Sequence, residues 1–85
     1  MSLLFLDYDL RKQRNYKPLY DELKRFSATR VLESSWAFTR VNTSCKGLRD
    51  HFTQFIDNDD GLCVTEVVDW ATHKALSAPP QTAAS

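Results

Sequence analysis

Glycine is scarce in this chain of 85 residues, which has only Gly47 and Gly61. Loops that cradle phosphate groups need several closely spaced glycines, because side chains would keep the backbone amides away from the phosphate. The sequence therefore excludes the glycine-rich phosphate loops of nucleotide-binding folds. Net charge is also absent, since eleven basic residues balance eleven acidic ones. A neutral chain does not attract nucleic acid as a whole, so any such binding needs a local basic patch.

Motifs for a zinc site and for nucleophilic catalysis are missing as well. The two cysteines, Cys45 and Cys63, do not have the spacing of a zinc site. In a chain without a signal peptide we expect them to be reduced, structural thiols. The two histidines, His51 and His73, have no cysteine or serine at motif spacing, so the sequence does not indicate a nucleophile paired with a base.

Long apolar runs are absent too. The run at 3–6 is too short for a membrane span, and no basic segment precedes it as in a signal peptide. We therefore expect a cytoplasmic protein with no membrane partner. A chain of 85 residues makes one small domain with a marginal core, so oligomerisation is an expected source of further burial.

Hydrophobic periodicity predicts six elements in the order strand, helix, strand, strand, helix, strand. Their expected ranges are 3–10, 16–26, 29–34, 36–41, 45–56 and 62–68. This order predicts the α+β class and a ferredoxin-like βαββαβ sandwich, in which two helices cover one face of an antiparallel sheet. We expect one domain over 1–76. The remainder, 77–85, is expected to be a flexible tail because it has too little apolar surface to bury.

The second face of this sheet has no predicted cover. Phe5, together with Trp36 or Phe38, would then be exposed to water in a monomer. An uncovered apolar face on so small a domain predicts a homodimer in which the two sheets pack together.

The first strand ends in two carboxylates, Asp7 and Asp9. Side chains alternate across a strand, so these two point to the same face. One interpretation is a site for a hard divalent cation such as Mg²⁺, doubled across a dimer axis. The alternative is a strand end that reaches solvent, or salt bridges to Arg11, Lys12 or Arg30. The spacing alone leaves both interpretations open.

The connection after the first strand carries the best basic patch in the sequence. Arg11, Lys12 and Arg14 would pair with phosphates, and Tyr8 and Tyr16 would stack on bases. A loop of ordinary solvated charges is the competing interpretation.

Two adjacent serines, Ser34 and Ser35, stand between the second and third predicted strands. They would be able to bind a phosphate or a reacting group. A tight turn explains them equally well, since serine is common in turns without any further role.

The pair Tyr8-Asp9, followed by this order of elements, resembles the small ferredoxin-like proteins of CRISPR adaptation, called the Cas-two family, and the virulence-associated protein D toxins. The chain is more similar still to short bacterial and phage proteins related to them, the SinR-like proteins. The likeness covers roughly 3–70. The residues that carry it are Tyr8-Asp9-Leu10, Tyr16 with Leu19, Leu32 with Ser34-Ser35-Trp36, Leu48-Arg49-Asp50, and Asp57 through Asp60-Gly61-Leu62 with Val64.

The resemblance implies a homodimer with its two sheets packed together and with Asp9 near the dimer axis. In the CRISPR and toxin families the matching aspartate is implicated in Mg²⁺-dependent cleavage of RNA or DNA in some members, whereas other members act as scaffolds. This sequence departs from them in two ways. It lacks a strongly basic surface, and Ala37-Phe38 stands where the CRISPR proteins usually have Phe-Glu.

Two functions therefore stay open. The first is a non-enzymatic dimerisation or binding module whose partner is nucleic acid or another protein. The second is a Mg²⁺-dependent nuclease, an endoribonuclease for example, in which Asp9 aided by Asp7 holds the metal. Its expected nucleic-acid contacts are Arg11, Arg14 and Ser35. The neutral charge and the lack of a second catalytic group favour the binding module.

Overall fold

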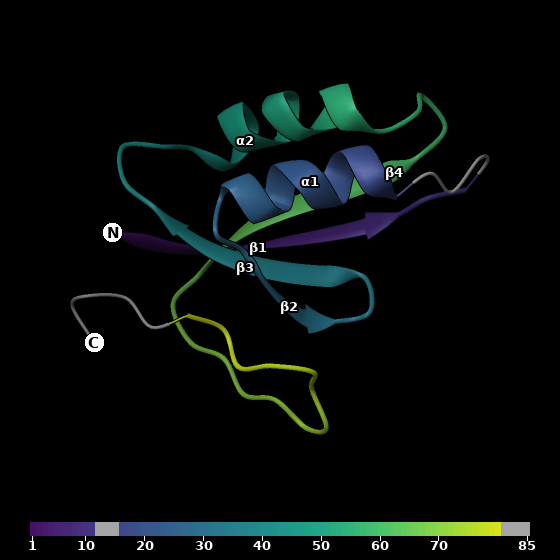
Figure 1. Ribbon diagram of the computed structural model, residues 1–85. Coiled ribbons are helices and arrows are strands. Elements are labelled where there is room, and N and C mark those ends of the chain that lie inside the picture. The colour runs from purple at the N-terminus through teal and green to yellow at the C-terminus, as the bar shows by residue number, and fades with distance from the viewer. Residues whose placement is uncertain (12–15, 81–85) are drawn as a thin grey trace.

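The computed structural model describes residues 1–11 and 16–80, which form a four-stranded antiparallel sheet and two helices (Figure 1). The elements are β1 (Ser2–Asp9), α1 (Lys17–Arg25), β2 (Thr29–Leu32), β3 (Ser35–Arg40), α2 (Cys45–Phe52), a 3-10 turn η1 (Thr53–Phe55) and β4 (Gly61–Val67). Across the sheet the order is β2-β3-β1-β4, and every neighbouring pair is antiparallel. The predicted α+β class and the predicted order of elements are confirmed.

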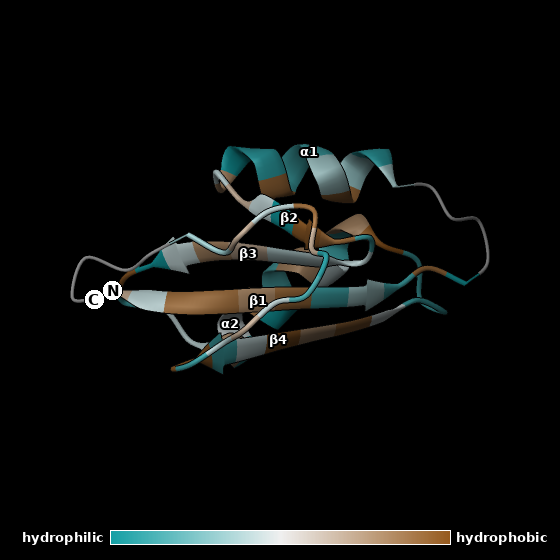
Figure 2. Cartoon of the chain, turned by 90° about the horizontal axis from the view of Figure 1, so that it is seen from below, coloured by the Kyte–Doolittle hydropathy of each residue, from teal (hydrophilic) through white to brown (hydrophobic). Residues whose placement is uncertain are grey.

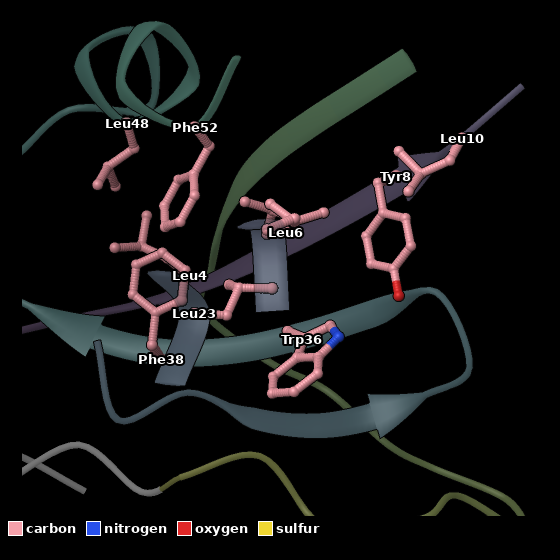
Figure 3. Packing of buried hydrophobic residues seen from close by; sticks show 10 residues of the cluster. Leu4, Leu6, Tyr8, Leu10, Leu23, Trp36, Phe38, Leu48 and Phe52 are labelled. Atoms are coloured by element: carbon pink, nitrogen blue, oxygen red, sulfur yellow. The ribbon is translucent and has the colours of Figure 1, made fainter. Parts of the chain in front are cut away.

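Both helices cover one face of the sheet, and the main core lies between these two layers (Figure 1). Along β1 the even positions point into this core, as the alternation of strand side chains requires. Leu4 lies opposite Phe38 on β3. Leu6 lies opposite Trp36, and Figure 3 shows both among the buried hydrophobic side chains of this core. The helices contribute Leu19, Leu23, Leu48 and Phe52.

Trp36 and Phe38 are therefore buried, and the expectation that one of them is exposed on the free face is wrong. The reason is the register of β3 with β1. Because residues directly opposite each other lie on the same face, the partners of the core residues Leu4 and Leu6 must also face the helices.

The other face, here called the outer face, is covered in part by the segment 68–80 after β4. This segment folds back beneath the sheet in Figure 1 and crosses its strands in Figure 2. The Leu76 amide donates a hydrogen bond to the Val31 carbonyl of β2 at 2.8 Å. Ala75 packs against a small second core of Leu3, Val31 and Ala37, and Pro79 is buried.

The predicted uncovered apolar face is thus wrong for the described chain, because the chain's own segment 68–80 covers the apolar half of it. Phe5 is half-buried and packs against the second core. The half of the outer face that stays open is its polar end, where β1 stops and β4 begins.

Local features mark the start of α2 and the end of α1. Ser44 caps the start of α2, because its Oγ accepts a hydrogen bond from the Gly47 amide at 3.0 Å. After α1, Ser27 adopts a left-handed conformation with φ of 56°.

Within 1–11 and 16–80, no helix has both the length and the apolar character that a bilayer crossing requires.

Candidate functional site

The two carboxylates of β1 both lie on the polar end of the outer face. Asp7 is opposite Ser35 of β3 on one side and Cys63 of β4 on the other. Asp9, two residues on, is opposite Gly61. An open depression runs over this end of the sheet, lined by Asp7, Tyr8, Asp9, Arg11, Gly61, Leu62 and Cys63.

Asp7 is engaged by a serine from the neighbouring strand. The Ser35 hydroxyl donates a hydrogen bond to the Asp7 Oδ1 atom, and both side chains are half-buried. The tight turn between β2 and β3 is formed by Glu33 and Ser34, so Ser35 is the first residue of β3 rather than a turn residue. Its hydroxyl therefore holds a strand carboxylate.

Asp9 is paired with Arg11, which is the salt bridge that one of the two interpretations anticipated. The Arg11 Nε atom lies 3.1 Å from Asp9 Oδ2, and the two side chains are 59% and 70% exposed. Arg11 also donates from its backbone amide to Asp60 Oδ1 at 2.8 Å and from Nη1 to the Asp59 carbonyl at 3.1 Å. One arginine thus ties the end of β1 to the loop that precedes β4.

Gly61 makes room for this arginine. A Cβ atom at position 61 would lie 2.8 Å from Arg11 Nη2, closer than real Cβ contacts. Its neighbours in the loop, Asp59 and Asp60, have further interactions of their own. The end of the outer face is therefore a connected network of charged and polar groups.

A metal ion would find an incomplete ligand set here. Across 1–11 and 16–80, no group of three or more histidine, cysteine, aspartate or glutamate side chains is placed to hold a metal ion. Asp7 and Asp9 offer carboxylate oxygens of the kind that Mg²⁺ prefers, and Mg²⁺ commonly keeps several waters. Both carboxylates already have partners in the chain, so a cation would compete with Ser35 and Arg11 for them.

Tyr8 is a core residue and is not available to stack on a base, contrary to the expectation for the basic patch. Its side chain is buried and points among the helix-facing residues (Figure 3). The hydroxyl donates to the Glu33 carbonyl at 3.0 Å and lies 2.7 Å from the Tyr20 hydroxyl. Burial, followed by the hydrogen bond with Tyr20, raises the pKa of Tyr8 well above its usual value.

Tyr16 is the more accessible tyrosine, with 38% of its surface exposed. Its ring centroid lies 5.5 Å from that of Tyr20 and 6.2 Å from that of Tyr8. It therefore forms the outer member of a cluster of three tyrosine rings in edge-on and tilted contact, which packs on the core. Lys12 and Arg14, the other predicted members of the basic patch, lie outside the described residues.

Arg30 has a different partner from the one considered in the sequence. It does not reach the aspartates but donates to the Tyr20 hydroxyl at 2.9 Å and, from two nitrogens, to the Glu33 carbonyl. Its guanidinium carbon lies 5.1 Å from the Tyr20 ring centroid. Arg30 therefore fastens the β2–β3 hairpin to α1.

Sequence reasoning missed a buried polar contact between the helices. Glu22 of α1 is only 4% exposed, and its carboxylate contacts Arg25 Nη1 at 3.0 Å and His51 Nε2 of α2 at 2.5 Å. A signal was present, because Glu22 follows Leu19 by three residues and precedes Phe26 by four, which is the spacing of one helix face. The spacing of residues in the sequence did not indicate that His51 of α2 would be its partner.

Comparison with known proteins does not assign the chain. It matches no protein-family model, and no solved structure matches it.

Proposed function

We propose that the protein is a non-enzymatic, homodimeric binding module with a ferredoxin-like fold, related to the Cas-two, virulence-associated protein D and SinR-like proteins. Single-stranded nucleic acid is its proposed ligand. The topology supports the fold, because β3 lies between β1 and β2, the two strands that α1 connects. That is the split arrangement of the βαββαβ class.

One observation supports binding over cleavage. Each carboxylate at the end of β1 is held by a side chain of the same protomer, Asp9 by Arg11 and Asp7 by Ser35. A nuclease metal site needs carboxylates whose charge is directed at the cation. Here the charge of Asp9 is balanced by a guanidinium, so the strand end acts as a cross-link within the fold.

The proposed ligand surface comprises Arg11, which follows β1, and Tyr16, which precedes α1. An exposed arginine pairs with phosphate oxygens, and an exposed tyrosine ring offers a face on which a base stacks. Tyr16 is supported from behind by Tyr20 and Tyr8, so its ring is already oriented before a base arrives. Arg14, which lies outside the described residues, is a further proposed contact on the basis of the sequence alone.

Fluorescence anisotropy with a labelled single-stranded RNA tests this proposal. Tyr16→Ala should weaken binding about fivefold or more, because stacking of one base contributes about 1–3 kcal/mol. Lys24→Ala is a matched control, since it removes an exposed residue near the far end of α1. Binding that is absent in the wild type, or equally weakened by both substitutions, contradicts the nucleic-acid proposal.

The second candidate is Mg²⁺-dependent cleavage of nucleic acid, with Asp9 from each protomer at the dimer axis. The observation that favours it is the position of Asp7 and Asp9 on one face, with most of the Asp9 side chain exposed. Incubation of labelled RNA with Mg²⁺ or Mn²⁺ tests it. Cleavage that disappears in Asp9→Asn but persists in Asp21→Asn, a control from another exposed ion pair, establishes this candidate.

A further inference from the structure

The two edges of the sheet are protected unequally. At the β2 edge, the Val31 carbonyl accepts a hydrogen bond from the Leu76 amide of the segment 68–80. At the other edge, β4 pairs with β1 alone, and no other strand of the described chain lies beside it (Figure 2). An unpaired edge strand presents free amide and carbonyl groups to any strand that approaches.

Nothing in the sequence of β4 blocks such pairing. The strand has no proline and no lysine, and it pairs with β1 without a bulge from Gly61 to Val67. Proline, lysine and bulges are the usual features that keep exposed edges from pairing. The only charged side chain of β4 is Glu66.

A groove runs beside this edge, between β4 and α2. It is lined by Cys45, Lys46, Arg49, Leu62, Cys63 and Val64. Leu62 and Val64 are half-buried and give it an apolar floor on the helix side of the strand. The groove therefore combines apolar surface with cations.

The charges of the groove are not balanced among the described residues. Asp50 accepts from both Lys46 Nζ at 3.1 Å and Arg49 Nη2 at 2.9 Å, so one carboxylate serves two cations. The hydrogen bond from Arg49, followed by the one from Lys46, lowers the pKa of Asp50. The Asp50 carboxylate therefore stays ionised. The Glu66 carboxylate, on the same face of β4 as the groove floor, is exposed and has no ionic or hydrogen-bonded partner within 1–11 and 16–80.

We propose that a second copy of this chain adds to the edge of β4, antiparallel and with Val64 opposite the partner's Val64. In this register Leu62 lies opposite the partner's Glu66, because residues directly opposite share a face. The partner's Glu66 then meets the surplus positive charge of Lys46 and Arg49, and the two-fold axis makes the same contact twice. The two sheets become one continuous sheet across the dimer.

The covered outer face favours this arrangement over packing of one sheet on the other. Ala75 already packs against the apolar residues of that face, whereas the β4 edge has free backbone groups and complementary charges. This inference rests on the homodimer of the proposed function and specifies its interface. It is independent of whether nucleic acid binds.

Sedimentation equilibrium over a range of protein concentrations tests the interface. Glu66→Lys places a cation against Lys46 and Arg49 and should raise the dimer dissociation constant at least about tenfold. The double variant Glu66→Lys with Arg49→Glu should restore dimerisation. Glu33→Lys makes the same charge change in the β2–β3 turn and should leave the dissociation constant unchanged.

The outcomes separate the two proposals. A wild-type chain that stays monomeric overturns both the homodimer and this interface. A dimer that Glu66→Lys does not weaken leaves the homodimer standing and overturns the β4 interface, in favour of packing through another face.

A cross-linking measurement checks the register without changing any charge. Cys63 is exposed, and in the proposed register it lies diagonal to the partner's Cys63, at about 7–8 Å. In a Cys45→Ser background, a short bis-maleimide should therefore link the two copies in high yield. A wild-type dimer that gives no such product overturns the proposed register.

Discussion

Arg11 holds Asp9 by a hydrogen bond of 3.1 Å from its Nε atom and at the same time reaches the Asp59 carbonyl of the loop before β4. This one side chain decides how the end of β1 is interpreted. With Arg11 in place, Asp9 belongs to a surface network that joins two neighbouring strand ends. A cation that used Asp9 would first have to displace the arginine.

Gly61→Ala is expected to loosen this network with little loss of stability. The added Cβ would approach Arg11 Nη2 to 2.8 Å, and the long arginine side chain is able to move away. Exposed ion pairs contribute about 0.2–1 kcal/mol, so the free energy of unfolding should fall by no more than about 1 kcal/mol. Urea denaturation measures it, and Asp9→Ala should have less effect in the Gly61→Ala background than in the wild type. If Asp9→Ala lowers the free energy of unfolding equally in both backgrounds, Gly61 and the Asp9–Arg11 pair are not coupled.

Glu22→Gln is expected to destabilise the fold by about 1–3 kcal/mol, because it weakens the contacts of a buried carboxylate with Arg25 and His51. Asp21→Asn is the matched control on the same helix, where the carboxylate is exposed and pairs with Lys17. Its effect should stay below about 1 kcal/mol. Thermal or urea unfolding of both variants measures the difference, and equal effects would argue against a structural role for the Glu22 contacts.

Tyr8→Phe is expected to cost about 1–3 kcal/mol, since it removes the hydroxyl that contacts Tyr20 and the Glu33 carbonyl. The pKa of Tyr8 is raised in the folded state by burial. The unfolded chain therefore loses this proton first, at a pH of about 10, and the free energy of unfolding should fall as the pH rises further.

Urea denaturation at a pH of about 9 and again at about 11 measures this loss. The decrease should be smaller in Tyr8→Phe than in the wild type. Tyr16→Phe is the control because its ring is partly exposed. If the free energy of unfolding of Tyr8→Phe falls as much as that of the wild type between these two pH values, groups other than Tyr8 cause the loss.

Ser27→Gly is expected to stabilise the protein by about 0.5–1 kcal/mol, because glycine adopts the left-handed backbone conformation without strain. Ser27 has φ of 56°, and the amides of Ser27 and Ala28 donate to the carbonyls of Lys24 and Leu23, which closes α1. Ser27→Ala is the control, since it removes the hydroxyl but keeps the Cβ atom. Thermal unfolding of both variants should show a gain for glycine alone.

The strand and helix patterns predicted much of the fold, because side-chain alternation and helical spacing are local properties. They placed Leu4 and Leu6 in a core strand and Asp7 and Asp9 on one face. They did not predict the Asp7 partner, because the turn lies one residue earlier than expected and Ser35 joins β3. A shift of one residue decides which face a side chain takes.

The cover of the outer face was not predictable in the same way. Composition describes a segment by itself, whereas Ala75 is half-buried through contacts with strands far away in the sequence. Hydrogen bonds such as that from Leu76 to Val31 depend on where the chain returns. The sequence predicted either a metal site or a salt bridge for Asp9. Only the three-dimensional structure identified Arg11 as its partner.

The central claim is that the protein binds single-stranded nucleic acid without cleaving it, and one experiment tests it most directly. Labelled single-stranded RNA is incubated with the purified protein and Mg²⁺, and each sample is run on a native gel and on a denaturing gel. The account predicts a shifted band on the native gel and full-length RNA on the denaturing gel, with Asp9→Asn giving the same result. Shortened RNA in the wild-type sample, restored to full length in Asp9→Asn, would contradict it.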